Sequence, residues 1–392
     1  MTDPGKYLGK PLVVLATGGT GGHMFPAEAL AAELAERGCR IALITDRRGG
    51  SFSDRFGGDR FGGAEIHRIL AAGMARKSFV KRLRGVSEMA LGVFQARSLL
   101  KRLAPRAVVG FGGYASVPTM LAAVYGGHKT ALHEQNAILG RANRLLAPRV
   151  MRIATAFKTP LDLPPEIRAK AVHTGMPVRA AILDMRERPY PSIGAEGPIR
   201  LMVIGGSQGA SVFSKVVPEA AGRLSESIRS RLQITQQCRP EDLEEARAAY
   251  KRLGLAANLS SFFDNVPELL AESHLVISRA GASSVAEITT IGRPSILSPY
   301  SYATDDHQTF NAHSVDKAGA GWLMPEESFY AGSLAARLES LFDLPAILEK
   351  TAACAFKAGA PDAASRLADM VCELLPSNGE TEIGPESRKE AA

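Results

Sequence analysis

Short runs of apolar residues alternate with helical patterns along most of this chain. Residues 11–16 predict a buried strand, residues 26–37 a helix, and residues 41–45 the next strand. The same plan starts again at residues 199–204, where an apolar run leads into a glycine loop at 205–209 and then into another helical pattern. Strands that alternate with helices form parallel sheets. The pattern therefore predicts an α/β protein with two Rossmann-like parallel-sheet domains in tandem.

A proline-rich stretch separates the two series. Prolines recur between residues 160 and 198 and interrupt the alternation of strands and helices there. The last residues, 376–392, are polar and show no periodicity, which is typical of a disordered tail. We therefore expect an N-terminal domain over residues 1–165, a linker over 166–198 and a C-terminal domain over 199–375.

Composition excludes several classes of protein. The chain has 392 residues, 45% hydrophobic and 22% charged, which is enough for two domains with their own cores. No apolar run approaches the roughly 18 to 20 residues that span a bilayer, and the start, MTDPGKYLGK, lacks the apolar stretch of a signal peptide. The four cysteines are scattered without a CxxC pair, as in a reduced cytoplasmic protein. Because the chain has neither a D-x-D motif nor a His/Cys cluster with ligand spacing, we expect no metal site and no cofactor.

The positive charge is concentrated in one segment. The formal net charge is +7, and residues 71–106 hold nine Lys/Arg residues against one acid, Glu88. Apolar side chains such as Phe79 and Phe94 are interleaved with these cations, a pattern that favours an anionic membrane surface as partner. A solvated helix face is the alternative, whereas no motif supports binding to nucleic acid.

Glycine-rich loops follow several predicted strands. The first is part of ATGGTGGHMFPAEALAAEL, residues 16–34, which fits neither G-x-G-x-x-G nor G-x-x-x-x-G-K-[ST]. Similar loops occupy residues 110–118, 205–211 and 278–287. One such loop is easily a tight packing turn, but the carboxyl ends of parallel strands share one crevice, where exposed backbone N–H groups bind anions and sugar hydroxyls. The four loops together predict a ligand site in that crevice.

Polar side chains near these loops are candidates for chemistry. His23 ends the first loop, where an imidazole donates a hydrogen bond or accepts a proton near neutral pH. His133, Glu134, Gln135 and Asn136 follow an apolar run, and they suit either sugar binding and activation or a helix cap and turn. His23 and Glu134 both remain candidates for the catalytic base.

A second polar group precedes the predicted helix after residue 304. Asp305 and Asp306 fit an ordinary acidic first turn, whereas the amide of Gln308 both donates to and accepts from a sugar hydroxyl. Glu287 lies about one helical turn after the glycine loop of residues 278–281, where acids commonly accept hydrogen bonds from a ribose. A solvent-exposed helix glutamate is the alternative for Glu287.

As a set, these motifs resemble those of the MurG family, the undecaprenyl-diphospho-muramoylpentapeptide N-acetylglucosaminyltransferases of bacterial peptidoglycan synthesis. The matching stretches run in the family's order from about residue 12 to 312. They are TGGTGGHMFPA, GFGGYASVP, HEQN, GMPVR, GGSQGA, SRAGASSVAE and DDHQTFNA. The resemblance implies the GT-B fold, in which two Rossmann-like domains face a cleft.

The resemblance also implies an activity and a location. The enzyme would move GlcNAc from UDP-GlcNAc to the muramoyl 4-hydroxyl of lipid I, forming lipid II, with inversion at the anomeric carbon and without an essential metal. It would be attached peripherally to the inner face of the cytoplasmic membrane. Two other classes share features of this pattern: the non-hydrolysing UDP-GlcNAc 2-epimerases, and a non-catalytic UDP-sugar-binding regulator docked on membranes.

Site residues carry over from the family by motif. The resemblance implies that Gln308 binds the GlcNAc hydroxyls, Glu287 the ribose and the main chain of Phe263 the uracil. The other implied contacts with the donor are Thr20, Gly21, Gly22, Asn136, Arg179, Ser207, Ala282, Ser283, Ser284, Val285 and Ala286. This chain departs from the family at Met176 and His307, where the family often has Asn and Gln.

Overall fold

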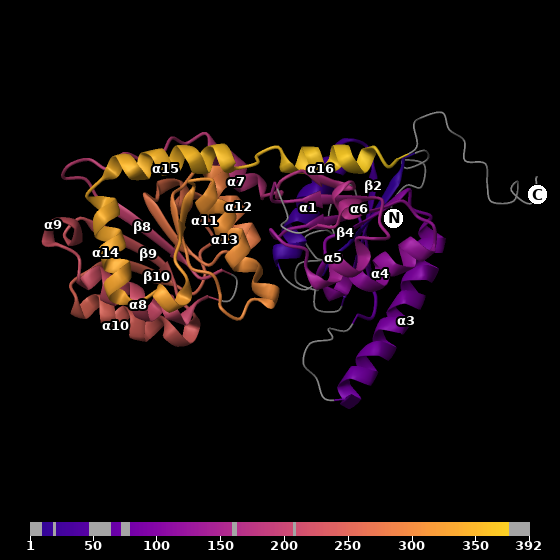
Figure 1. The fold of residues 1–392 in the computed structure, drawn as a ribbon, viewed down its shortest axis with the longest axis horizontal. Coiled ribbons are helices and arrows are strands. Elements are labelled where there is room, and N and C mark those ends of the chain that lie inside the picture. Colours follow the sequence, from indigo (N-terminus) through magenta and orange to yellow (C-terminus); the bar gives the residue numbers. More distant parts are fainter. Residues whose placement is uncertain are drawn as a thin grey trace, which may run out of the picture.

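Two α/β domains lie next to each other in the computed structural model (Figure 1). The structure describes residues 10–18, 21–46, 64–71, 79–158, 163–206 and 209–375, and of residues 79–84 it describes the backbone only. Each domain is built on a parallel sheet covered by helices. The prediction of two Rossmann-like parallel-sheet domains is therefore confirmed.

The N-terminal domain is built on a seven-stranded sheet, counted over the described residues, in the order β3-β2-β1-β4-β5-β6-β7. Its strands are β1 (Leu12–Ala16), β2 (Arg40–Thr45), β3 (Glu65–Arg68), β4 (Ala107–Gly110), β5 (Thr130–Glu134), β6 (Arg152–Thr155) and β7 (Ala171–His173). The helices between them are α1 (Gly21–Glu36), α3 (Phe79–Leu103), α4 (Gly113–Tyr125), α5 (Arg141–Leu146) and α6 (Pro165–Arg168). The central strands are buried because helices cover both faces, as their continuous apolar runs predict.

The C-terminal domain is built on a six-stranded sheet in the described part of the chain, in the order β10-β9-β8-β11-β12-β13. Its strands are β8 (Ile199–Ile204), β9 (Leu232–Gln237), β10 (Ala256–Ser260), β11 (Leu275–Ser278), β12 (Ser295–Leu297) and β13 (Gly321–Leu323). Its α-helices are α8 (Ser211–Gly222), α9 (Glu226–Arg229), α10 (Leu243–Arg252), α11 (Val266–Glu272), α12 (Ala282–Ile291), α13 (His307–Lys317), α14 (Ala331–Phe342) and α15 (Pro345–Ala358). The described residues of this domain also form the short 3-10 helices η4 (Pro240–Asp242), η5 (Thr304–Asp306) and η6 (Glu326–Ser328).

The chain crosses between the domains twice. The predicted linker, 166–198, contains β7, which pairs with β6 at the edge of the first sheet, and α7 (Ala180–Arg186), which packs on α11 and α12 of the second domain. The final helix, α16 (Ala363–Cys372), returns to pack on α1, and in Figure 1 it is the yellow helix above the N-terminal domain. The observed arrangement thus differs from the predicted boundaries at β7 and α16. The predicted tail, 376–392, lies outside the described residues.

Candidate active site

Loops at the carboxyl ends of the two sheets touch where the domains meet, and Asn311 is at the centre of one such contact. Asn311 of α13 donates to the Asn136 side chain (Nδ2–Oδ1, 3.1 Å) and to the carbonyl of Ala280 (3.0 Å). Its Oδ1 accepts from the backbone N–H of Ala137 at 2.8 Å. Asn311 is fully buried, so all three bonds are shielded from water. The contact brings the loop after β5 against the loop after β11, as expected for strand ends facing a shared crevice.

His23 lies in the first turn of α1, directly after β1. Its Nδ1 donates to the side-chain oxygen of Gln135 at 3.1 Å, and its carbonyl accepts from Thr17 Oγ1 at 3.0 Å. The ring packs against Gly113, where a Cβ atom would lie 3.3 Å from His23 Cδ2. Gly113 also has a φ of +70°, so a side chain there would be strained as well as crowded. Burial lowers the pKa of His23 below its usual value, which keeps the ring neutral at physiological pH.

Glu134, the other candidate base, is saturated with hydrogen bonds. It is buried at the end of β5, and its Oε1 accepts from the backbone N–H of Asn136 at 2.9 Å. Its Oε2 accepts from the N–H of Gly140 (2.9 Å) and from Asn143 Nδ2 (2.8 Å). Burial raises the pKa of this carboxyl, while the donated bonds favour its charged form. These contacts fix the loop between β5 and α5, and they favour His23 over Glu134 as the base.

Arg179 and Glu287, predicted separately as donor contacts, are joined to each other. Arg179 Nε and Nη2 donate to the two carboxylate oxygens of Glu287 at 2.8 and 3.0 Å. The Arg179 guanidinium also lies 5.4 Å from the ring centroid of Phe25 in α1. Arg179 directly precedes α7, and Glu287 lies in α12. The pair therefore connects the segment between the domains to the helix that carries the SRAGASSVAE motif.

The N-terminus of α12 has no side-chain cap in the described structure. The N-cap residue is Gly281. Such an end presents unpaired N–H groups and a positive dipole end, which together bind phosphate groups. Ser283 and Ser284 lie half-buried in the first turn. The side chains of Val285 and Ala286 are buried in the core, so any ligand contact of these two residues is confined to the main chain.

The remaining predicted donor contacts lie in first turns of helices and in loops of both domains. Gln308 is in the first turn of α13, and its Oε1 accepts from the N–H of Tyr300 at 3.0 Å, which leaves its NH₂ group as the donor for a sugar. Phe263 is half-buried in the loop after β10. Gly21 and Gly22 form the first turn of α1, which begins five residues before the predicted start at Pro26. Pro26 therefore lies inside the helix, where it has no N–H to donate to the carbonyl of Gly22. Two predicted residues lie outside the described residues: Thr20 and Ser207.

Sequence reasoning missed two residues of this region. Asn311 was quoted within DDHQTFNA without a role, although its position one turn after Gln308 places it on the same helix face. Arg279 is 8% exposed and forms a bidentate pair with Glu326 (3.2 and 3.1 Å). Glu326 in turn accepts from the N–H of Ser301 at 3.2 Å, so this pair supports the loop that holds Gln308.

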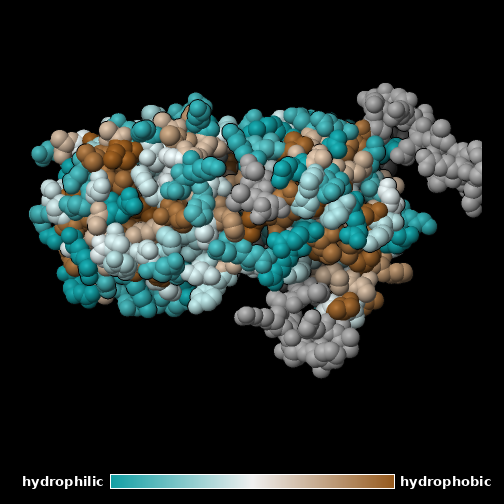
Figure 2. Space-filling model, in the orientation of Figure 1, coloured by the Kyte–Doolittle hydropathy of each residue, from teal (hydrophilic) through white to brown (hydrophobic). Residues whose placement is uncertain are grey.

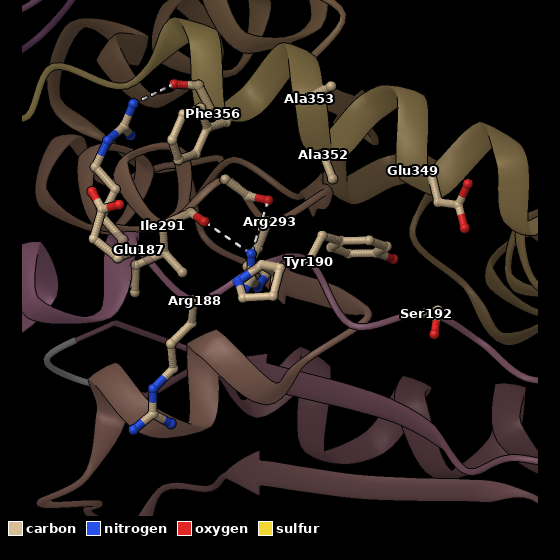
Figure 3. Close-up of a pocket in the computed structure, with 13 residues that line it drawn as sticks. Glu187, Arg188, Tyr190, Ser192, Ile291, Arg293, Glu349, Ala352, Ala353 and Phe356 are labelled. Atoms are coloured by element: carbon tan, nitrogen blue, oxygen red, sulfur yellow. Dashed lines mark hydrogen bonds between the residues drawn. The ribbon is translucent and has the colours of Figure 1, made fainter.

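One cavity lies away from these residues. It has a volume of about 480 Å³ and is lined by the segment after α7, the end of α12 and α15 (Figure 3). Arg293 donates to the carbonyls of Ile291 and Gly292 there, and burial lowers its pKa to about 10. Arg188 points away from α15 in Figure 3. None of the residues predicted for the site lines this cavity, and we assign it no ligand.

Comparison with known proteins identifies the family. Residues 13–155 match the N-terminal domain of glycosyltransferase family 28, and residues 200–367 match its C-terminal domain. A UDP-N-acetylglucosamine–N-acetylmuramyl-(pentapeptide) pyrophosphoryl-undecaprenol N-acetylglucosamine transferase of Paramagnetospirillum magneticum is 58% identical, over 94% of this chain and 98% of the relative. A relative of the same name from Rhodospirillum rubrum is 52% identical, over 94% of each chain.

Solved structures agree with this result. The crystal structure of Acinetobacter baumannii MurG aligns with a TM-score of 0.75 at 27% identity, over 93% of this chain and 99% of that one. A UDP-GlcNAc 2-epimerase of Neisseria meningitidis aligns with a TM-score of 0.65 at 13% identity, over 93% of this chain and 100% of the other, and shares the fold alone. The chain therefore belongs to glycosyltransferase family 28 and, within it, to the MurG family of N-acetylglucosamine transferases.

Proposed function

We propose that this protein transfers GlcNAc from UDP-GlcNAc to the muramoyl 4-hydroxyl of lipid I, forming lipid II for peptidoglycan synthesis. High identity to transferases of this name over nearly the whole chain supports the proposal. The structural observation that carries it is the contact between the domains. Asn311 of the C-terminal domain binds Asn136, the residue next to Gln135, which holds His23. A donor held by the C-terminal domain would therefore meet an acceptor next to His23.

In this proposal the donor lies on the C-terminal domain. Glu287 accepts from the ribose hydroxyls, the main chain of Phe263 contacts the uracil, and the NH₂ group of Gln308 donates to a GlcNAc hydroxyl. The uncapped N-terminus of α12 lies against the diphosphate. Its N–H groups and dipole stabilise the negative charge that grows on the β-phosphate as the bond to the sugar breaks.

His23 acts on the acceptor in this scheme. Its neutral ring takes the proton of the muramoyl 4-hydroxyl while that oxygen attacks C1 of GlcNAc from the face opposite to UDP. The new C1–O bond forms as the bond from C1 to the diphosphate oxygen breaks, so UDP leaves and the configuration at C1 inverts. The proton ends on His23, and burial of the ring favours its later release to solvent.

We further propose that α3 docks the enzyme on the inner face of the cytoplasmic membrane. Val86, Leu91 and Phe94 are 55%, 55% and 73% exposed on this helix. Figure 2 shows apolar surface over α3. Lys101 and Arg102 lie in its last turn, and each cation near an anionic surface contributes about 1 kcal/mol. Among the described residues, no helix is long and apolar enough to cross a bilayer.

UDP release tests the proposed reaction. The enzyme is incubated with UDP-GlcNAc, with and without a lipid I analogue, and UDP and the sugar products are measured. We expect UDP release that depends on the acceptor, together with a disaccharide product. Epimerisation of UDP-GlcNAc without the acceptor would identify a 2-epimerase instead. Donor binding without UDP release in the presence of the acceptor would identify a non-catalytic regulator.

A further inference from the structure

A chain of hydrogen bonds runs from His23 into the buried interior of the N-terminal domain. His23 Nδ1 bonds Gln135 Oε1 at 3.1 Å, and Gln135 Nε2 lies 3.3 Å from His133 Nδ1. His133 Nε2 bonds the carbonyl of Gly175 at 3.2 Å. Gln135 is 3% exposed and His133 is fully buried, so the bonds between them and to Gly175 are shielded from water, whereas His23 is half-buried. Glu134, which lies between them in sequence, bonds a different set of groups.

Two backbone carbonyls determine where the protons of this chain lie. The Gly175 oxygen can only accept, so His133 carries its proton on Nε2 and leaves Nδ1 as an acceptor. The Phe111 oxygen accepts from Gln135 Nε2 at 2.7 Å, so this atom is the amide nitrogen and Oε1 faces His23. An oxygen in that place accepts a hydrogen bond only from a protonated Nδ1 of His23. The other ring nitrogen, Nε2, is therefore the proton acceptor of the neutral ring.

We propose that Gln135 is a positioning residue that fixes the reactive tautomer of His23, and that His133 and Phe111 hold its amide in the required orientation. The inference rests on the proposed function, because it concerns the base of that reaction. A histidine in the wrong tautomer presents an N–H to the acceptor hydroxyl and cannot remove its proton. In serine proteases, loss of the tautomer-fixing partner lowers kcat by up to about 10⁴-fold. A neutral amide is a weaker partner than a carboxylate.

The surroundings of His23 make the pH dependence informative. Burial is the largest effect and lowers the pKa of His23, and the nearby His307 of α13 lowers it a little further. Hydrogen bonding to the Gln135 side chain and to the backbone of Phe111 raises it. His133 of β5 also interacts with this ring, and burial lowers its pKa to about 4, so it stays neutral in the working range. Removal of the Gln135 oxygen therefore lowers the pKa of His23.

The test compares Gln135→Met with Gln236→Met in steady-state transfer to a lipid I analogue. Gln236 is a matched control because it is a buried glutamine whose Oε1 accepts one hydrogen bond, from Tyr250 (2.6 Å), in the other domain. We expect Gln135→Met to lower kcat by about 10- to 100-fold, with less than about a threefold change in KM for UDP-GlcNAc. The acidic limb of its kcat/KM profile should move to lower pH. Gln236→Met should leave both kcat and this limb close to the wild type.

A double variant separates positioning from general damage. In a His23→Ala background, Gln135→Met should cause little further loss, because the group through which Gln135 acts is gone. Losses that multiply in the double variant, or an acidic limb that does not move in Gln135→Met, would overturn the proposal.

A direct measurement of the tautomer needs no variant of Gln135. ¹⁵N spectra of the histidine-labelled full-length protein, with the His23 signal assigned by its absence in His23→Ala, should show a proton on Nδ1. A proton on Nε2 in the neutral ring would refute the inference, even if Gln135→Met failed to fold. The proposed function is tested separately, because it fails if the wild-type protein transfers no GlcNAc. The ¹⁵N spectra still report the tautomer of His23 in that case.

Discussion

Replacement of Glu287 by Ala should weaken UDP-GlcNAc binding by about ten- to a hundredfold. Arg179 already occupies one lone-pair position on each oxygen of this carboxylate. A carboxylate has about four such positions, so one on each oxygen remains for the two ribose hydroxyls. The ribose can therefore bind without breaking the ion pair. A charge-assisted hydrogen bond is worth about 1.5 to 3 kcal/mol, which corresponds to the stated loss of affinity.

The assay is calorimetric titration with two donors, UDP-GlcNAc and its 2′-deoxyribose analogue. The wild type should bind the analogue more weakly by about tenfold, because the carboxylate is then left with an unused position. Glu287→Ala should lose most of that preference. Glu219→Ala serves as the matched control, since Glu219 is an exposed helix glutamate of the same domain.

The reasoning would be refuted if the effects of Glu287→Ala and of the missing ribose hydroxyl on the binding free energy were additive. If the deoxy analogue loses the same factor with the wild type and with Glu287→Ala, the carboxylate does not contact the ribose. A thermal melt accompanies the titration, because the variant leaves Arg179 without its partner. Arg179 is 34% exposed, so the loss of unfolding free energy should be about 1 kcal/mol. A much larger loss of stability would mean that the pair acts on the fold rather than on the donor.

Three further outcomes are expected. His23→Ala should lower turnover by about 10² or more with a much smaller change in donor affinity, and near-normal turnover in steady-state assays would return Glu134 as the candidate base. Phe94→Ser should weaken binding to anionic vesicles by about tenfold. Tyr302→Ser, a control at an even more exposed aromatic residue of the C-terminal domain (84% against 73%), should leave binding unchanged. Equal vesicle binding by both variants in sedimentation assays would exclude α3 as the docking surface. Burial lowers the pKa of His133 and of His274 to about 4, below the unfolded value near 6.5. At a pH between the folded and unfolded pKa values, the unfolded chain therefore binds more protons than the folded protein. The free energy of unfolding, measured with urea, should be about 2 to 4 kcal/mol lower at pH 5 than at pH 7. An equal free energy at both pH values would contradict the burial of these two histidines in the neutral form.

The sheet architecture was predictable because it depends on local pattern. Strands such as β1 and β8 are continuous apolar runs, and each precedes a glycine loop and a helix. The edge strand β7 was not predictable, because it has three residues and its central one, Val172, is 40% exposed. The periodicity of α16 identifies a helix with an apolar face, but it does not say which of the two sheets that face covers.

In the candidate site too, some features follow from the local sequence and others only from the folded structure. His23 was predictable as a site residue because it directly follows a glycine loop at a strand end. The hydrogen bonds of His23 and of the residues around it were not predictable, because their partners come from distant parts of the chain. The ion pair between Arg179 and Glu287 and the bonds of Asn311 to the other domain form only after both sheets are in place. Sequence motifs name such residues but do not say which atom faces which.

The return of α16 to the first domain has a consequence for synthesis on the ribosome. Leu367, Val371 and Leu374 complete the core formed by α1 and one face of the first sheet. This core includes Leu30 and Leu34, which are fully buried in the finished protein. During translation the N-terminal domain emerges first, yet that face stays uncovered until nearly the last residue of the C-terminal domain has been made. The nascent first domain therefore exposes an apolar surface for most of its synthesis, which makes it a substrate for holding chaperones and leaves a chain truncated before residue 363 prone to aggregate.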